Sequence, residues 1–464
     1  MTNVGVAPLA GCRIAAGGQG TAGDYARRLL ASLGAQVSPA GSRPDEHPAL
    51  AWKRSGLMDL TGRADGPPRM CPVPLAACAD GAFAALATLG DGLAVGAGSG
   101  AALLGIRARH AGLVRNGAAS PGGSCRLLRT ADGELAINLA RPDDWTLVPA
   151  WLECDGTADW EQLAAAVARS SATQLLERAR LLGLAAAIAD VPKIEAPPWV
   201  RVAPIGTRVP ARSRAHAPLV VDLSSLWAGP LCGHLLQGLG ARVVKVESQQ
   251  REDGARRGPP AFFNRLNAGK ASVRLDLATP AGRSQLQQLV ARADIVIEAS
   301  RPRAMRQLGI RAEEVVAARP GVTWLSITGH GREEPQAGWI AFGDDAGVAA
   351  GLSRILRDTT GESLICGDAI GDPLTGLHAA LAAWASHVSG GGHLIALSLK
   401  DVLAHCVAFD LPRSAEALAE RHHAWTRAAA RSGAGRSTYP ASARRARPIG
   451  ADTHAVLAEL GIRC

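Results

Sequence analysis

The stretch from 219 to 247 constrains the fold of this chain most, because strand and helix patterns alternate there without a gap. An apolar run at 219–223 is followed by the small-residue turn Ala228-Gly229-Pro230, an amphipathic stretch and a second apolar run at 242–246. Short apolar runs bounded by turns predict buried strands, and the period between them predicts a helix. A strand, a helix and a second strand in this order predict a parallel α/β sheet.

A weaker copy of this pattern lies in the first part of the chain. Residues 22–37 echo 228–243 at an offset of 206 residues, with shared Ala-Gly, Leu-Leu and Leu-Gly-Ala steps. A second echo relates 81–86 to 376–381 at an offset of 295 residues. The first copy is therefore shorter between its echoes and lacks most of the residues that would build a sheet. The chain is interpreted as two related halves, of which only the second is intact.

Length and composition indicate a soluble globular protein of two or three domains. The chain has 464 residues, 47% of them hydrophobic, and only 4% aromatic against 53 glycines, which predicts tight turns and close helix–strand packing. The net charge of +9 fits either a basic surface or a polyanionic ligand such as a nucleotide or coenzyme A (CoA). No nucleic-acid-binding module accompanies this charge, so we expect no nucleic-acid partner.

Cysteine usage and hydropathy indicate the cytoplasm. The nine cysteines form no C-x-x-C pair, which favours reduced thiols and argues against a zinc site or a disulfide scaffold. The first residues lack the basic region and apolar stretch of a signal peptide, and no run approaches the roughly 20 apolar residues of a membrane span. We therefore expect a cytoplasmic protein that is not embedded in a membrane.

Four regions follow from these patterns. Residues 1–115 are the degenerate copy, and 116–191 form a small α+β domain with a glycine loop and a hairpin around Asp132-Gly133. A Pro/Arg-rich linker is expected at 192–218. Residues 219–464 are the large domain, in which strands near 272–277, 295–297, 322–327 and 394–397 each return after a helix. The predicted fold is α/β, a Rossmann-like doubly wound parallel sheet plus the small domain.

Two glycine motifs in the first half carry little functional information. The motif Gly18-x-Gly20-x-x-Gly23 has the spacing of a dinucleotide fingerprint, but Val37 is followed by Ser38 rather than by the acid that would hold a ribose. The motif that begins at Gly96 lies in Ala/Gly-rich sequence and is interpreted as packing.

Nine short motifs follow one another in the second half, and together they resemble the class III CoA-transferases. These motifs are Ala228-Gly229-Pro230, Lys245-Val246-Glu247, Asn267 to Lys270 with Ser272, Leu275-Asp276-Leu277, Pro280-Ala281-Gly282, Ala293-Asp294, Glu298, Arg301-Pro302 and Gly371-Asp372-Pro373-Leu374-Thr375-Gly376. The resemblance covers 217–400 and extends to a tail at 448–461. It implies an acyl-CoA:carboxylate CoA-transferase that binds acyl-CoA and CoA as substrates, with no permanently bound cofactor, and that forms a homodimer.

The resemblance assigns the catalytic role to Asp372. In this family an aspartate at that place attacks the acyl-CoA thioester and carries first the acyl group as a mixed anhydride and then CoA as a thioester. A carboxylate suits this role because the acceptor is itself a carboxylic acid. Taken alone, an aspartate before Pro-x-Thr-Gly is more often a helix cap. Asp368, four residues earlier, is a rival nucleophile.

The resemblance also implies the residues that meet CoA. They are the backbone near Ala228 and Gly229, the segment containing Asn267 and Lys270, and the basic side chains Arg301 and Arg306. Arginine and lysine suit phosphate groups through their charge and their donors. Two positions depart from the family: Ala299-Ser300 replaces an Asn-Phe pair, and Trp227 replaces a polar residue.

The first half resembles the small domain of the family and provides the lid. Gly122 and Gly123 fall where family members carry a mobile glycine loop over the active site, although an ordinary turn before a hairpin has the same sequence. The second echo places Ala77 opposite Asp372, so the first copy has no nucleophile. We expect the first half to supply the small domain and lid, while the second half supplies the CoA-binding sheet and Asp372.

Single residues bear on the other activities found in this family. The racemase branch needs a histidine after the Ala337-Gly338 step, but Trp339 stands there, and His330 lies in a separate turn. Asp344 and Asp345 fall where the family places a polar residue facing the active site, although solvated loop acids have the same pattern. A catalytically silent CoA-binding or partner subunit and an intramolecular CoA-transferring isomerase remain alternatives to the transferase.

Overall fold

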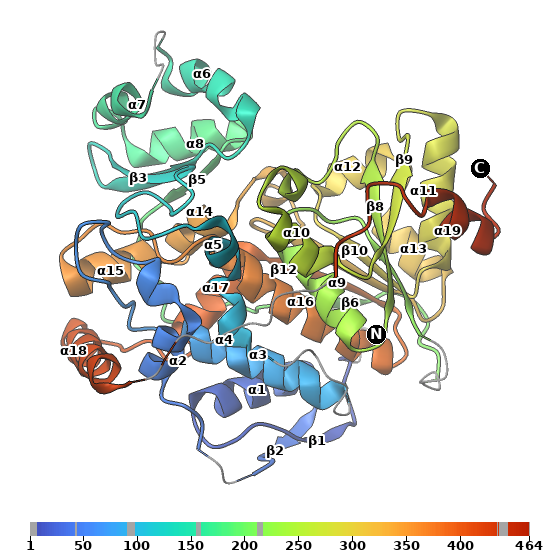
Figure 1. Cartoon of the computed structure of the whole chain (residues 1–464), viewed down its shortest axis with the longest axis horizontal. Helices are drawn as coiled ribbons and strands as arrows, with labels where there is room; N and C mark the ends of the chain where they lie inside the picture. The colour runs from blue at the N-terminus through green and yellow to red at the C-terminus, as the bar shows by residue number, and fades with distance from the viewer. Residues whose placement is uncertain are drawn as a thin grey trace, which may run out of the picture.

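The computed structural model describes residues 7–41, 44–90, 98–154, 159–210, 217–433, 435 and 444–463. Gly96 and the last part of the expected linker, 211–216, lie outside these residues. A large sheet with helices on both faces forms the body, and the first half packs against one side of it (Figure 1). A small domain, drawn in teal, stands above helices α14 and α15.

The large sheet has seven strands in the order β6-β12-β11-β10-β7-β8-β9. Six of them run parallel to their neighbours and come from the second half: β7 (Leu219–Asp222), β8 (Arg242–Ser248), β9 (Ala271–Leu275), β10 (Ile295–Glu298), β11 (Thr323–Thr328) and β12 (His393–Ser398). The chain builds outward from β7 to β9 and then restarts at β10 on the other side of β7. This order is that of a doubly wound sheet with its switch point between β7 and β10, as the sequence predicts.

Alternating residues of the central strand β7 pack on opposite faces of the sheet. Val220 belongs to a core shared with α9 (Ala228–Gly238), α16 (Gly371–Val388) and α17 (Leu399–Ala408). Val221 belongs to the opposite core, which contains α11 (Pro280–Arg292), α13 (Ala312–Ala318) and α19 (Thr453–Glu459). Because both faces are covered by helices, the central strands are continuously apolar, which is why the sequence identified them.

The expected linker contributes a strand to the sheet. β6 (Arg201–Pro204) pairs antiparallel with β12, and Ala203 lies opposite Leu394. Sequence patterns did not indicate this strand, because proline and exposed side chains surround it. An edge strand pairs on one side only and tolerates such residues.

The first half shares its core with the large domain and does not form a separate one. Its elements are β1 (Arg13–Ala15), α1 (Thr21–Ser32), β2 (Gln36–Ser38), α2 (Pro48–Ser55), α3 (Leu75–Leu89), α4 (Gly100–Leu103) and α5 (Ile106–Ala111), with β1 and β2 in a two-stranded parallel sheet. Helix α3 packs against α16, and the buried Tyr25 donates to or accepts from His378 of α16 at 2.7 Å. Cooperative unfolding of the two halves is expected from this shared core.

The internal repeat is visible as the same backbone contact in both halves. A Cβ atom at Gly376 of α16 would lie 2.7 Å from the carbonyl oxygen of Ala228, at the start of α9. A Cβ atom at Gly81 of α3 would lie 2.5 Å from the carbonyl oxygen of Ala22, in α1. These are the residue pairs that the two sequence echoes relate. The α1–α3 pair therefore repeats the α9–α16 pair, and α3 and α16 pack on each other.

The small domain is an antiparallel sheet covered by helices. Its strands are β3 (Cys125–Arg129), β4 (Glu134–Asn138) and β5 (Ala185–Ile188), and its helical segments are η2 (Pro142–Leu147), α6 (Val148–Leu152), α7 (Trp160–Val167) and α8 (Ala172–Leu182). Trp151 is fully buried in its core. Strands β4 and β5 lie against α14 (Gly343–Ala349), which connects this domain to the large one.

Further helices cover the body between these parts. They are η1 (Leu57–Asp59), η3 (Gly254–Arg257), α10 (Pro260–Asn267), α12 (Pro302–Gln307), η4 (Gln336–Gly338), α15 (Leu352–Thr360) and α18 (Ala415–Arg431). Helix α18 lies at the surface against α2 and α15.

The α9–α16 contact makes Gly376→Ala a test of the repeat. The added methyl group would meet the Ala228 carbonyl at 2.7 Å, and overpacking of this kind costs about 1–3 kcal/mol. The helix preference of alanine offsets only about 1 kcal/mol of this. We expect Gly376→Ala and Gly81→Ala both to lower the melting temperature measured by calorimetry. Gly338→Ala is the control, since a Cβ atom there meets nothing within 4 Å; equal stability of all three variants would contradict the contact.

Candidate functional site

Asp372 lies in the first turn of α16, where its carboxylate meets the starts of two other helices. It accepts hydrogen bonds from the backbone N–H groups of Ala228, the first residue of α9, and Gly343, the first residue of α14. Pro373 follows it and is tolerated because the first helical turn has no internal partner for its nitrogen. The free N–H groups and the dipole of α9 favour the ionised carboxylate.

Two glycines allow this close approach. A Cβ atom at Gly343 would overlap both the Oδ2 atom of Asp372 and the carbonyl oxygen of Ala369. A Cβ atom at Gly371 would lie 3.1 Å from the Cα atom of Gly343. Any side chain at Gly343 would therefore push the carboxylate of Asp372 away from its two donors.

Three further aspartates surround Asp372, and each uses its carboxylate differently. Asp344 accepts from the backbone N–H of Ala369 at 2.6 Å. Asp345 accepts from the backbone N–H of Phe342 at 2.9 Å and from the Nδ2 atom of Asn138 at 3.0 Å. Asp368, Asp344 and Asp345 are all buried. The solvated-loop interpretation of Asp344 and Asp345 is thus wrong for this structure.

Burial raises the pKa of three of these acids. It raises the pKa of Asp372 to about 6, and Asp368 adds to this rise. Burial raises the pKa of Asp344 to about 7, again with a contribution from Asp368. It raises the pKa of Asp345 to about 7. A carboxylate that is desolvated but still ionised at neutral pH is a stronger nucleophile than one in water, and Asp372 fits this description.

Asp368, the rival nucleophile, is held by an ion pair. Its side chain is fully buried, and it accepts from Nε of Arg107 at 2.9 Å and also from the Nη2 atom of Arg107. Both carboxylate oxygens are therefore occupied by one guanidinium group. This geometry favours Asp372 over Asp368 as the group that attacks a substrate.

Residues from the first half complete the site. Arg107 comes from α5, Asn138 comes from the end of β4, and a Cβ atom at Gly122 would lie 3.6 Å from the Nη2 atom of Arg107. Asp344, Asp345, Asp368 and Asp372 form an acidic cluster. The glycine loop, with Gly123 at φ 79°, thus adjoins this acidic cluster within one chain. Sequence analysis missed Arg107 and Asn138, because neither residue belongs to a motif that marks a site.

Asn267 and Lys270, expected to meet CoA, are used inside the fold. The buried Lys270 forms an ion pair with Asp222 at 2.9 Å and donates to the carbonyl oxygen of Pro230 at 2.8 Å. Asn267 is also buried and donates from Nδ2 to the carbonyl oxygen of Phe263 at 3.1 Å. The structure does not bring these two side chains to the carboxylate of Asp372, whereas Ala228 contacts it and Gly229 follows in α9.

Arg301 lies at the seam between the small domain and the sheet. A Cβ atom at Gly183 would lie 3.8 Å from its Nη1 atom. Burial lowers the pKa of Arg301, and its neighbours Arg303, Arg141 and Arg251 lower it further. This group of guanidinium side chains makes the seam strongly positive. Arg306, the other basic residue expected to meet CoA, is exposed on α12.

His330 is placed against Trp339 rather than beside Asp372. The two rings lie 5.7 Å apart, and burial lowers the pKa of His330 to about 4. None of the hydrogen bonds found among the described residues joins His330 to Asp372.

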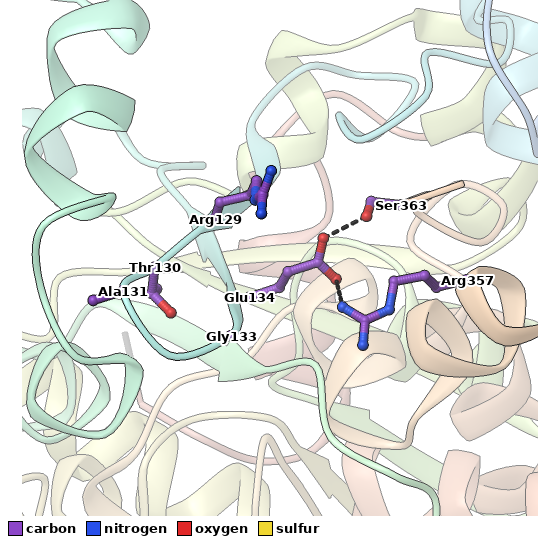
Figure 2. A pocket seen from close by; sticks show the side chains of 7 residues that line it. All are labelled: Arg129, Thr130, Ala131, Gly133, Glu134, Arg357 and Ser363. Carbon is purple, nitrogen blue, oxygen red and sulfur yellow. Dashed lines mark hydrogen bonds and ion pairs between the residues drawn. The ribbon is translucent and has the colours of Figure 1, made fainter. Parts of the chain in front are cut away.

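A separate cavity of about 360 Å³ lies between the β3–β4 turn and α15. Its lining includes Arg129, Glu134, Arg357 and Ser363, and Figure 2 shows that Glu134 is engaged by two of them. Arg357 donates to Glu134 at 3.1 Å, and Ser363 donates to its other oxygen. Because none of the expected site residues lines this cavity, it is interpreted as part of the domain junction.

No group of three or more His, Cys, Asp or Glu side chains in the described ranges is placed to hold a metal ion. In the same part of the chain no helix has both the length and the apolar character needed to cross a bilayer.

A comparison of the sequence with protein families identifies the family of this chain. The family described as CoA-transferase family III matches residues 218–460, which is more than half of the chain. The chain belongs to CoA-transferase family III. The match begins at the strand that opens the large sheet and contains Asp372, whereas Arg107, Gly122 and Asn138 lie outside it.

Curated relatives match less than half of the chain. Succinate–glutarate CoA-transferase of Agrobacterium fabrum is 31% identical over 200 residues, which are 39% of this chain and 50% of that protein. Succinyl-CoA–D-citramalate CoA-transferase of Chloroflexus aurantiacus is 32% identical over 171 residues, 35% of this chain and 42% of that protein. The chain thus spans about half the length of the curated relatives it matches. Among solved structures, a CaiB/BaiF family protein of Brucella suis is 31% identical, with a TM-score of 0.37 over 41% of this chain and 55% of that one.

The acidic cluster makes the stability of the protein depend on pH. Burial gives Asp345 a folded pKa of about 7, above its value in an unfolded chain of about 4. The folded state therefore holds the proton more tightly, and stability falls as pH rises between about 4 and 7. We expect the melting temperature of Asp345→Asn relative to the natural chain to rise over this interval and then level off. A difference that stays flat from pH 4 to 8 would contradict a raised pKa.

Proposed function

We propose that this protein is an acyl-CoA:carboxylate CoA-transferase that acts through Asp372. The observation that carries the proposal is the carboxylate of Asp372, which the backbone N–H groups of Ala228 and Gly343 hold, whereas the neighbouring Asp368 is held in an ion pair by Arg107. Membership of CoA-transferase family III supports the reaction class. Asp372 lies near the amino end of α9, the helix that follows the central strand β7. Doubly wound sheets bind their ligands at this end of their central strands.

The proposed reaction proceeds in two halves. Asp372 attacks the thioester carbonyl of acyl-CoA, the CoA thiolate leaves, and an aspartyl mixed anhydride forms. The thiolate then attacks the aspartyl carbonyl of this anhydride, which releases the donor acid and leaves CoA on Asp372 as a thioester. In the second half the acceptor carboxylate attacks that thioester and expels the CoA thiolate, which leaves a second aspartyl mixed anhydride. The thiolate then attacks the acyl carbonyl of this anhydride, which forms the new acyl-CoA and releases the carboxylate of Asp372. Each tetrahedral intermediate carries an oxyanion that backbone N–H groups stabilise.

We further propose how the substrate is held. The backbone at Ala228 and Gly229 and the basic side chains Arg301 and Arg306 meet CoA, since the positive seam around Arg301 suits its phosphates. Asn267 and Lys270 support this surface from inside through their contacts with α10 and α9. The loop at Gly122 and Gly123 closes over Asp372, and Asp344 faces the substrate carboxylate.

Two finer properties complete the proposal. We place the protein in the cytoplasm, in keeping with its cysteine pattern and its CoA substrates. We also propose a homodimer, in which the α3–α16 packing inside one chain repeats part of a subunit contact. Light scattering of the purified protein measures this state directly.

Trapping of the covalent intermediate tests the nucleophile. After incubation with a panel of acyl-CoA donors and then hydroxylamine, we expect peptide mass spectrometry to show a hydroxamate at Asp372. Asp372→Asn should lose the label and lower kcat at least about a thousandfold. Asp358→Asn is the matched control, because this aspartate is exposed and pairs with Arg354 in α15. A label at Asp368, or CoA binding without transfer, would reject the proposal in favour of the rival nucleophile or a silent CoA-binding subunit.

The raised pKa of Asp372 predicts the pH dependence of the reaction. Only the ionised carboxylate attacks, and its pKa is about 6. We therefore expect kcat/KM to be constant above pH 7 and to fall about tenfold for each pH unit below 6. A profile that stays flat down to pH 4.5 would show that Asp372 does not titrate as the attacking group.

A further inference from the structure

We propose that Arg107, supplied by the first half of the chain, is a positioning residue for Asp372 that holds the turn before it and favours its ionised form. The inference rests on the proposed function, because it assigns Arg107 a task in the same site. It goes beyond that function by making the degenerate half necessary for activity. Arg107 lies outside the residues that match the family.

The ion pair between Arg107 and Asp368 joins the two halves at the site. Arg107 donates from Nε to Oδ2 of Asp368 at 2.9 Å and from Nη2 to Oδ1. The side chain of Asp368 is fully buried, whereas 32% of the Arg107 side chain is exposed. A buried carboxylate without its partner would be strongly destabilising, so Asp368 depends on this guanidinium. A planar fork that binds both oxygens also fixes the orientation of the carboxylate.

Asp368 begins the turn that leads into Asp372. The next residue, Ala369, has a φ of 45°, a conformation that costs alanine free energy and needs support from its surroundings. Its N–H donates to Asp344 at 2.6 Å, and its carbonyl oxygen accepts from the N–H of Asp372 at 2.9 Å. Arg107 anchors the first residue of this turn and Asp344 anchors the second. Together they set where the chain enters α16 and thus where the carboxylate of Asp372 points.

The charges around Asp372 are mostly negative. Asp344 and Asp345 face it from α14, Asp368 faces it from the preceding turn, and Arg107 faces it from α5. The thiol of Cys125, from β3, lies near Asp344 and Asp345. Burial and Asp368 raise the pKa of Asp372, whereas Arg107 lowers it. Without Arg107 the cluster would hold protons more tightly, and less Asp372 would be ionised at neutral pH.

The position of Arg107 suits a group that acts through Asp368 and the turn. Its guanidinium carbon lies 6.0 Å from the ring centroid of Trp227, next to the start of α9, and Gly122 of the glycine loop adjoins its Nη2 atom. The lid, the ion pair and the donors of Asp372 therefore meet around one side chain. Two of its three guanidinium nitrogens, Nε and Nη2, already engage Asp368, which is why we assign it a positioning role.

Variants at the two ends of the ion pair test the inference by the sign of the pH shift. Arg107→Gln should raise the midpoint of the kcat/KM profile by about one pH unit, so that kcat/KM falls about twofold at pH 7 and about tenfold at pH 5, with recovery at higher pH. Asp368→Asn should lower the midpoint, because it removes a negative charge and leaves the guanidinium to Asp372. Arg107→Lys should keep the midpoint near that of the natural chain but lower kcat, since it retains the charge and loses the fork. Arg63→Gln is the control, because Arg63 is exposed and pairs with the exposed Asp65.

A merely structural role would scale activity equally at every pH and leave both midpoints unchanged, which would overturn the inference. If Arg107→Gln does not fold, the double variant Arg107→Gln with Asp368→Asn replaces the buried pair by two neutral side chains. Its midpoint should lie between those expected for the two single changes. A double-variant midpoint equal to that of Asp368→Asn would overturn the role of Arg107.

A readout that needs no transfer activity separates this inference from the proposed function. The melting-temperature difference between Asp372→Asn and the natural chain should grow with pH and level off near pH 6, following ionisation of Asp372. In the Arg107→Gln background it should level off about one pH unit higher, and in the double variant it should level off at a higher pH than in the Asp368→Asn background. If no acyl-CoA supports transfer, the proposed function fails while this measurement still decides the role of Arg107. If the melting-temperature difference levels off at the same pH with and without Arg107, the inference is overturned.

Discussion

The contact between α9 and α16 is the constraint on which the rest of the site depends. Gly376 lets the two helices approach so closely that a Cβ atom at this position would lie 2.7 Å from the carbonyl oxygen of Ala228. The same Ala228 offers its N–H to the carboxylate of Asp372, one helical turn earlier in α16. Because one residue of α9 is fixed at both its carbonyl and its N–H, the position of Asp372 follows from helix packing. The third contact, from Gly343, needs a residue without a side chain for the same steric reason.

The repeat of this contact explains how a degenerate half remains part of the molecule. The α1–α3 pair keeps the packing of Gly81 on Ala22, although Ala77 stands where the active half has Asp372. Selection for packing alone would preserve the glycine and lose the acid. The first half does more than support the second, because its elements α5 and β4 bring Arg107 and Asn138 to the acidic cluster. Both halves of one chain therefore contribute residues to the proposed active site.

The sequence was sufficient for the parts of the fold that depend on local patterns. The strands β7 to β12 and the helices between them appear where apolar runs and turns predict them, and the strand order follows from the helix-connected pattern. The edge strand β6 was missed because an edge tolerates proline and polar residues. The expectation that Lys270 meets CoA is at odds with its buried ion pair to Asp222, since motif spacing does not show which partner a lysine binds. Arg107 was missed because its partner is 261 residues away.

The amino-acid sequence by itself determined the doubly wound sheet, the family and the position of Asp372 at the start of a helix. These properties depend on periodicity and on motifs whose residues are neighbours along the chain. Only the tertiary structure decided which of the two acids is held by a guanidinium group and what surrounds the other. Asp368 and Asp372 are alike in sequence, and they differ because one is paired with Arg107 from the other half while the other faces backbone N–H groups. Burial and distant charges set the state of a carboxylate, and both arise only when the halves pack together.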